Sequence, residues 1–388
     1  MKVIRPSEHT LIYTNVAAND EPTWESGTTY AQSALVKVTD VDVHKVYRST
    51  RGGNINRYPP DWTEPQQETA TSSTSHEASL GAKTFTTQSG KGFSPGMVVQ
   101  IAKTTTPRTV NMTAEVVSYS GTSLAVSVYA KTGDGTHAAW TITSEDEIGF
   151  WSEVGATNQY ACLDEYVNTQ TEHLEIIHLK FSAEKLDYVS LFNLKGADVE
   201  FTLWDADETT VLWTETVSLI YGTAGVQSTS WSDYFFGEFN PRTECSFPIP
   251  FAAANAVIEI KVIAADGTDA AIGNVLIGRS HDIGQAVYGM NAGILDFSMA
   301  ETDDQGRTKV APGPWSKRCE IDLRLPRRRV DGVHSVLSSL HGTPTAWIGV
   351  PGVDGYDSFT IYGTFREFDL TVPGNLHAWC RLEIEGLI

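Results

Sequence analysis

The amino-acid sequence predicts an all-β protein, made of several β-sandwich or small β-barrel modules in series with one short helix in the C-terminal unit. Short runs that alternate apolar and polar residues recur along the chain, such as residues 97–101, 124–128 and 211–219. Gly, Asp, Asn, Thr and Ser separate these runs, and Val, Ile, Thr and aromatic residues are plentiful inside them. A length of 388 residues indicates about two or three domains.

The first expected unit joins residues 1–64 to residues 148–160. Aromatic and β-branched residues gather between Trp24 and Tyr47, but residues 51–60 end in a polar loop before a fold is complete. Phe150 and Trp151 open a new apolar segment. We therefore expect the N-terminal unit to resume at about Ile148, after an insertion.

The expected insertion covers residues 65–147. Residues 63–83 are rich in Thr, Ser and Glu with almost no large apolar residue, which predicts a linker. From Thr84 to Ile142 a series of short runs separated by Gly turns predicts a small β module.

Two further units are expected, a β-sandwich over residues 161–284 and a strand-rich unit over residues 285–388. The predicted helix lies in the second of these. Its apolar residues recur at helical spacing, and Gly342 and Pro344 follow as stop signals; the apolar positions are Val330, Val333, Val336, Leu337 and Leu340.

The charge of the chain and its lack of targeting signals argue against nucleic-acid binding, classical export and membrane insertion. Because the chain has a formal net charge of −20 and would repel the phosphate backbone, we do not expect it to bind nucleic acid. The first residues lack the apolar core of a signal peptide, and no run approaches the length of a membrane span, so we expect neither classical export nor membrane insertion. The four cysteines form no CxxC pair, which favours buried reduced thiols in a protein assembled in the cytoplasm.

Sequence patterns for catalysis and for metal binding are weak. No Walker A or HExxH motif occurs, and we expect no catalytic residues, no metal site and no cofactor. The Asp-rich runs at residues 204–208 and 301–306 lack the EF-hand pattern and are typical of hairpin turns. His173 and His178 are five residues apart on an expected strand and point to opposite faces. Paired carboxylates for glycoside cleavage are a three-dimensional property, so a glycan hydrolase stays an alternative.

Aromatic residues near the N-terminus form the candidate glycan-binding site. Flat aromatic faces with nearby amides suit sugars. Asn54 and Asn56 are the candidate amides, and the candidate platform is Trp24, Tyr30, Tyr47 and Trp62. The alternative is that these aromatic residues are the core of a small β unit.

A basic run is the candidate assembly contact. Arg327, Arg328 and Arg329 stand together in an acidic chain and could pair with carboxylates of a neighbouring subunit. The alternative is a solvated strand end before the helix. Obligate interfaces are often apolar, which adds Trp315, Trp347 and Phe365 as expected interface residues.

Two segments resemble proteins of tailed bacteriophages. FTTQSGKGFSPGMVVQI (85–101), MTAEVVSYSGTSL (112–124), GDGT (133–136) and WTI (140–142) resemble a small β module found in phage tail and fibre proteins. Residues 151–171, with Trp151 and the run GATN before Asp164, resemble a segment of phage tail structural proteins.

The C-terminal unit is similar to a tail-tip or baseplate component of such phages, in the runs GTP (342–344), WIG (347–349), YG (362–363) and EIEGL (383–387). The resemblance implies a non-enzymatic structural protein of the virion tail, assembled with other tail proteins as a homo-oligomer in a symmetric ring. Contact with host surface glycans is a further expectation, and the alternatives are a receptor-binding adhesin and a tail-associated glycan hydrolase.

A shorter resemblance lies upstream. WESGTTY (24–30), Val36 and HKVYR (44–48) are similar to the short aromatic module of chitin- and cellulose-binding domains. Gln32-Ser33-Ala34-Leu35 stands where that family has its Gly-Asp turn. The resemblance implies a small β unit that binds carbohydrate.

Overall fold

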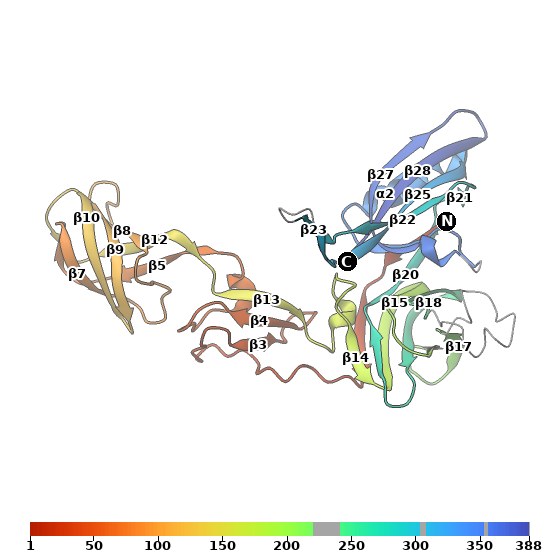
Figure 1. Ribbon diagram of the computed structural model, residues 1–388, viewed down its shortest axis with the longest axis horizontal. Coiled ribbons are helices and arrows are strands. Elements are labelled where there is room, and N and C mark those ends of the chain that lie inside the picture. Colours follow the sequence, from red (N-terminus) through yellow and green to blue (C-terminus); the bar gives the residue numbers. More distant parts are fainter. Residues whose placement is uncertain (220–240, 303–307, 353–355, 388) are drawn as a thin grey trace. The chain divides into compact units, whose positions relative to one another are not determined.

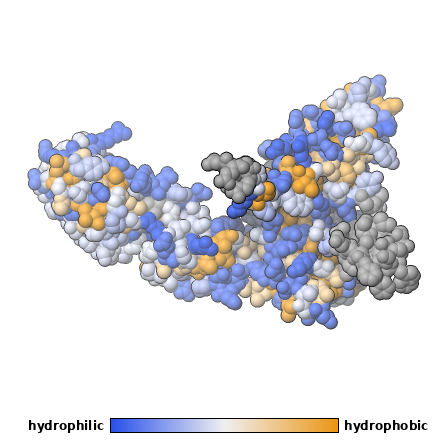
Figure 2. Space-filling view, viewed as in Figure 1, coloured by the Kyte–Doolittle hydropathy of each residue, from blue (hydrophilic) through white to orange (hydrophobic). Residues whose placement is uncertain are grey.

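The computed structural model describes residues 1–219, 241–302, 308–352 and 356–387, most of which lie in antiparallel strands (Figure 1). The predicted all-β class is confirmed. Compact packing divides the chain into two units, Asn19–Thr157 and a second unit that combines Met1–Ala18 with Asn158–Ile388. Hydrophilic residues cover much of the face shown in Figure 2.

Strands from the beginning and from the end of residues 19–157 form a small three-stranded sheet. Its order is β13-β4-β3, with β3 (Leu35–Val38), β4 (Lys45–Ser49) and β13 (Trp151–Ala156). The 3-10 helix η1 (Pro59–Trp62) follows β4 in the chain. Aromatic side chains dominate the core beneath the sheet, including the fully buried Phe150 and Trp151.

A six-stranded sheet with its own core lies in the chain between β4 and β13. Its order is β5-β12-β8-β9-β10-β7, and a short β6–β11 pair accompanies it. The strands are β5 (Gln66–Ser72), β6 (His76–Glu77), β7 (Gly81–Thr86), β8 (Val98–Lys103), β9 (Asn111–Ser120), β10 (Ser123–Thr132), β11 (Thr136–His137) and β12 (Trp140–Ile148).

The expected linker at residues 63–83 is wrong. Gln66–Ser72 form β5, which pairs with β12 and buries Glu68, Ala70 and Ser72 on alternate positions. These inward side chains are small or charged, so the segment lacks the large apolar residues by which a buried strand is usually recognised. Glu68 is tolerated inside because Arg57 pairs with it.

The second unit is built on one long sheet, whose order is β17-β16-β18-β15-β20-β1-β26-β27-β28-β25-β21. Two strands pair beside this path, β2 with β15 and β22 with β25. The strands of the second unit up to β20, of which β14 and β19 form a separate pair, are β1 (Lys2–Pro6), β2 (His9–Thr14), β14 (Thr171–Leu174), β15 (Ile176–Phe192), β16 (Asp198–Trp204), β17 (Val211–Ser218), β18 (Glu244–Ile263), β19 (Asp269–Ile272) and β20 (Asn274–Asp282).

The later part of this unit contains the described α-helix, α2 (Val330–Ser339), which confirms the predicted short helix. Its Val333 and Leu337 are buried, and Gly342 adopts the positive φ of +67° expected of a helix stop signal. The neighbouring elements are β21 (Gln285–Ala286), β22 (Asn291–Asp296), β23 (Met299–Thr302), β24 (Thr308–Ala311), β25 (Trp315–Pro326), β26 (Thr345–Ile348), β27 (Thr360–Thr371) and β28 (His377–Gly386), with 3-10 turns η2 (Ala161–Leu163), η4 (Arg327–Arg329) and η5 (Asp357–Phe359).

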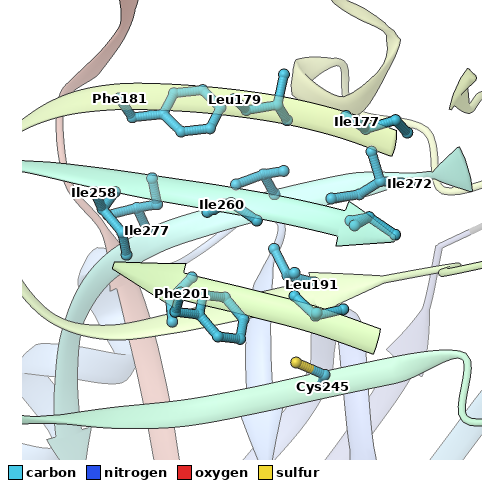
Figure 3. Close-up of a cluster of buried hydrophobic side chains, with 14 of the residues drawn as sticks. Ile177, Leu179, Phe181, Leu191, Phe201, Cys245, Ile258, Ile260, Ile272 and Ile277 are labelled. Atoms are coloured by element: carbon cyan, nitrogen blue, oxygen red, sulfur yellow. The ribbon is translucent and has the colours of Figure 1, made fainter. Parts of the chain in front are cut away.

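The largest apolar cluster lies under β15, β16, β18 and β20, where branched side chains of facing strands interdigitate (Figure 3). Ile177, Leu179 and Phe181 of β15 are fully buried at alternate positions, and Ile258 and Ile260 of β18 lie close to them. A second cluster packs α2 against the strands of the 315–386 region.

The first strand corrects two expected domain boundaries. β1 lies between β20 and β26, with Ile4 opposite Ser280 on one side and Ala346 on the other. Residues 1–18 therefore belong with residues 158–387 and not with residues 19–64. The same strand makes one continuous sheet across the expected boundary at residue 284. Pairing over such sequence distances leaves no periodic signal in the strand itself.

Candidate assembly and ligand-binding surfaces

The expected glycan platform is wrong for two of its four members, which are core residues. Tyr30 and Tyr47 are buried, and burial raises the pKa of Tyr47 to about 12. Trp24 and Trp62 are half-buried and pack edge-to-face on Tyr58 and Phe150, each with a ring-centroid distance of 5.3 Å. These contacts form the core of the three-stranded unit, so the aromatic rings do not gather into one exposed flat platform.

The expected amide partners are also engaged in the fold. Asn54 is fully buried, and its side-chain amide donates hydrogen bonds to Ser49 Oγ at 3.2 Å and to the carbonyl oxygen of Phe150 at 3.1 Å. Asn56 adopts a positive φ of +56° in the following loop. Asn54 therefore closes the small unit internally and is not available to a sugar.

The arginine run forms the exposed turn η4 between β25 and α2. Arg329 donates to Asp282 Oδ2 at 2.8 Å and to the Asp282 carbonyl oxygen at 2.7 Å. Arg327 donates to Asn375 Oδ1 at 3.2 Å. The same chain therefore supplies hydrogen-bond acceptors for Arg327 and Arg329, although such partners were expected on a neighbouring subunit. Arg328 is exposed.

The three expected apolar interface residues separate in the structure. Trp347 is fully buried, and its indole N–H donates to the carbonyl oxygen of Gly363 at 3.0 Å, so it is not an interface residue. It is buried because β26 lies inside the sheet between β1 and β27. Phe365 is half-buried against Trp347, with a ring-centroid distance of 6.0 Å. Trp315 is 54% exposed.

An exposed β arm, defined here as β22, β23 and β24 (residues 291–302 and 308–311), extends from β25. Within the described residues, β22 pairs with β25 along one edge only, and β23 pairs with β24 as a separate hairpin. The arm presents large apolar side chains to solvent, with Ile294 67%, Met299 68% and Val310 59% exposed. Figure 2 shows apolar surface beside the end of this hairpin.

The base of the arm is held by backbone contacts. The N–H of Phe297 donates to the carbonyl oxygen of Pro314 at 3.0 Å, and the N–H of Gly313 donates to Ser298 Oγ at 3.0 Å. A Cβ atom at Gly313 would lie 2.5 Å from the carbonyl oxygen of Phe297, so the two chain segments approach too closely for a side chain there. These contacts fix the chain where the arm joins β25.

Strand β22 and the residues around it lack the devices that usually protect an exposed strand edge. Such edges commonly bear Lys, Pro or several charges that discourage pairing with another chain. Asp296 is the one charged residue among residues 287–300. An exposed edge with apolar side chains and little charge can accept a strand or an apolar surface of another protein.

An open cavity of about 320 Å³ lies beside Trp315 in the 158–387 region, next to the base of the arm. Its walls come from four places in the chain: the loop at Val167 and Asn168, the end of β15, the start of β18, and the neighbouring ends of β25, β27 and β28. Strand pairing holds these walls together, because Phe192 of β15 lies opposite Glu244 of β18. Tyr362 packs on Phe192 with a ring-centroid distance of 5.4 Å.

Polar groups in the cavity wall are fixed in place. Lys317 and Glu244 form an ion pair at 2.6 Å, with one quarter or less of each side chain exposed. Burial raises the pKa of Glu244, although the ammonium of Lys317 opposes that shift. The Asn193 amide donates to the carbonyl oxygen of Val167 at 2.7 Å. Asn168 is exposed at the wall.

The Asp-rich turn and the two histidines are explained by local contacts. Asp205 accepts hydrogen bonds from the N–H groups of Thr209 at 2.8 Å and Thr210 at 3.2 Å, as in an ordinary Asp turn. Asp303 and Asp304 lie outside the described residues. His178 Nε2 lies 2.7 Å from Glu259 Oε1, and His173 Nδ1 lies 2.9 Å from the carbonyl oxygen of Leu174.

The described part of the chain holds neither a metal-binding cluster nor a membrane-spanning helix. No group of three or more His, Cys, Asp or Glu residues there has an arrangement that could hold a metal ion. No helix there is long and apolar enough to cross a membrane.

Sequence reasoning identified Trp315 but missed its surroundings. Asn168, Asn193 and Glu244 come from separate segments, and only the strand pairing brings them to one cavity. Strand β22 had a weak signal, because residues 287–300 have a single charge in a chain whose charged residues make up 20% of the total.

Comparisons with known proteins assign no family to this chain. No family model matches it, and no curated protein matches it. A structure of allantoicase aligns over 71% of this chain and 93% of its own, with 8% identity and a TM-score of 0.21. The N-terminal tandem CBM22 domains of Paenibacillus barcinonensis Xyn10C align over 70% of this chain and 98% of their own, with 10% identity and a TM-score of 0.12.

Proposed function

We propose that this protein is a non-enzymatic structural component of a bacteriophage tail tip or baseplate, and that it assembles with other tail proteins through the arm. The phage context comes from the sequence resemblances within residues 84–388. The observation that supports an assembly role is the arm itself, a strand edge with Ile294, Met299 and Val310 exposed.

Binding of a partner protein to the arm is expected to be energetically favourable. Each large apolar side chain that passes from water into an interface contributes roughly 1.5–3 kcal/mol when fully buried. Backbone N–H and C=O groups along the open edge of β22 add hydrogen bonds when a partner strand pairs with it. Several copies in a ring would repeat these contacts, so weak individual contacts would add up to a stable assembly. The protein would then be located in the virion tail, after assembly in the host cytoplasm.

Purified tailed phage particles allow this proposal to be tested. Mass spectrometry of purified particles should detect the chain, and electron microscopy should place its copies around the tail axis. Ile294→Asp should reduce incorporation several-fold, because a carboxylate would be buried in the contact. Val117→Asp is the matched control, since Val117 is 57% exposed on β9 and lies outside the arm. Particles that lack the chain, or equal incorporation of the two variants, would contradict the proposal.

A second candidate function, a receptor-binding adhesin, is favoured by a different observation. Trp315 is exposed beside a cavity whose wall includes the Lys317–Glu244 ion pair and asparagine side chains, a combination that suits recognition of a small ligand. The cavity adjoins the base of the arm, because Trp315 lies opposite Asp296 of β22, but the exposed residues of β23 and β24 do not line it, so the two functions are compatible in one tail protein.

A further inference from the structure

We propose that the cavity beside Trp315 binds a neutral saccharide. The inference deepens the second candidate function and does not depend on the arm contact. It moves the glycan-binding site from the N-terminal aromatic residues, where Tyr30 and Tyr47 are buried, to the 158–387 region.

The exposed indole is the first part of the argument. A pyranose ring has an apolar C–H face that stacks on a flat aromatic ring, and tryptophan offers the largest such surface together with an N–H donor. Trp315 lines the cavity and keeps 54% of its surface exposed. By contrast, Phe192 and Tyr362 in the same wall are buried, so they shape the cavity while Trp315 stays accessible.

The polar groups are the second part. Sugar hydroxyls both donate and accept hydrogen bonds, and side-chain amides match them because they also do both. Asn168 and Asn193 line the wall, and the bond from Asn193 to Val167 fixes the orientation of one amide. A fixed partner costs less conformational entropy on binding than a mobile one.

Charge balance decides the class of sugar. The ammonium of Lys317 and the carboxylate of Glu244 are 2.6 Å apart and neutralise one another within the wall. A cavity with one cation paired to one anion selects neither an anionic nor a cationic ligand. The volume of about 320 Å³ lies at the lower end of ligand sites, which are about 300–1,000 Å³, and suits one or two sugar rings.

The test uses the full chain and a panel of glucose, galactose, rhamnose, N-acetylglucosamine and their short oligosaccharides. Saturation-transfer NMR and titration calorimetry should detect binding of at least one member. Trp315→Ala should weaken that binding roughly tenfold or more, and Asn168→Ala should weaken it several-fold. Trp379→Ala is the matched control, because Trp379 is 42% exposed on β28 and does not line the cavity.

Each outcome decides the proposal. Binding that Trp315→Ala weakens and Trp379→Ala leaves unchanged supports it, provided that circular dichroism shows both variants folded. No binding by any member, or equal binding by the Trp315 variant, overturns it. Binding confined to charged polysaccharides with steep salt dependence overturns the neutral class. Val310→Asp changes the arm on β24, away from the cavity lining, and should bind saccharide normally even where it reduces incorporation, so a failed arm contact and a failed saccharide site give different results.

Discussion

The guanidinium of Arg57 and the carboxylate of Glu68 form an ion pair at 2.5 Å, and both side chains are almost completely buried. The N–H of Gly92 also donates to Glu68, at 2.9 Å, and the guanidinium carbon of Arg57 lies 3.6 Å from the centroid of the Phe150 ring. Glu68 belongs to the six-stranded sheet, and Phe150 belongs to the core of the three-stranded sheet. This pair therefore links the two sheets of the 19–157 unit.

Removing the carboxylate should destabilise that unit strongly. Glu68→Ala would leave Arg57 as a buried charge without its partner, which typically costs about 3–5 kcal/mol. Denaturant unfolding followed by tryptophan fluorescence measures the change in the free energy of unfolding. Glu153→Ala is the control, because its 2.8 Å pair with Lys45 is partly exposed and should contribute at most about 1 kcal/mol. Equal losses in the two variants would show that the buried pair is not special.

The N-terminal strand should be essential to the 158–387 region. Ile4 is fully buried in β1 between β20 and β26, so Ile4→Ala should lower the free energy of unfolding by about 2–5 kcal/mol. Hydrogen exchange should then accelerate at the amides of both neighbouring strands. Ile12→Ala is the comparison, since Ile12 is 46% exposed on β2. Unchanged exchange in β20 and β26 after the Ile4 change would contradict this role.

The thiols should be inert in the folded protein. All four cysteines are free and buried, and burial raises the pKa of Cys162, Cys245 and Cys319 to about 12 and that of Cys380 to about 11. The thiolate is the reactive form, and a raised pKa makes it rare at about pH 7.5. Ellman's reagent should label no cysteine under native conditions and all four in guanidinium. Rapid native labelling would show that a thiol is accessible.

Arg329 should contribute to the acid sensitivity of the fold. Burial opposes ionisation of Asp282, but hydrogen bonds from Arg329 and from the Gly284 N–H outweigh it and hold the pKa of Asp282 below its ordinary value. A carboxyl group with a lowered pKa stabilises the folded state above its unfolded pKa, and this stabilisation is lost as the pH falls through the folded pKa.

Arg329→Gln should therefore raise the pKa of Asp282 in an NMR titration. It should also lower the free energy of unfolding at neutral pH by at most about 1 kcal/mol, because both side chains are about half exposed and solvent screens them. The difference between variant and parent should shrink as the pH falls through the folded pKa of Asp282. A difference that persists in acid would assign the effect to packing and not to the ion pair.

Several features of this protein could be predicted from local sequence. Alternation of apolar and polar residues predicted strands such as β10 (Ser123–Thr132), where Leu124, Val126 and Val128 are buried. The apolar stripe from Val330 to Leu340 predicted α2. Each signal depends only on side chains a few residues apart, which is why a linear sequence displays it.

The candidate surfaces needed long-range information. The sequence predicted Trp347 at an interface, yet pairing of β26 with β1 and β27 buries it. It predicted Trp315 on the surface, but not the cavity that Lys317 and Glu244 build beside it. Whether an aromatic side chain is core or surface depends on which strands pair next to it, and those strands are far away in the sequence.

The sequence by itself determined the all-β class, the single predicted helix and the acidic charge of this protein, because these follow from composition and from periods of two and 3.6 residues. The tertiary structure decided the rest. It placed Ile4 between residues 280 and 346, buried Tyr30 and Tyr47, and left Ile294 exposed on an open strand edge. Strand pairing is chosen by the burial and hydrogen bonding of the whole sheet, and neither quantity exists until distant segments meet.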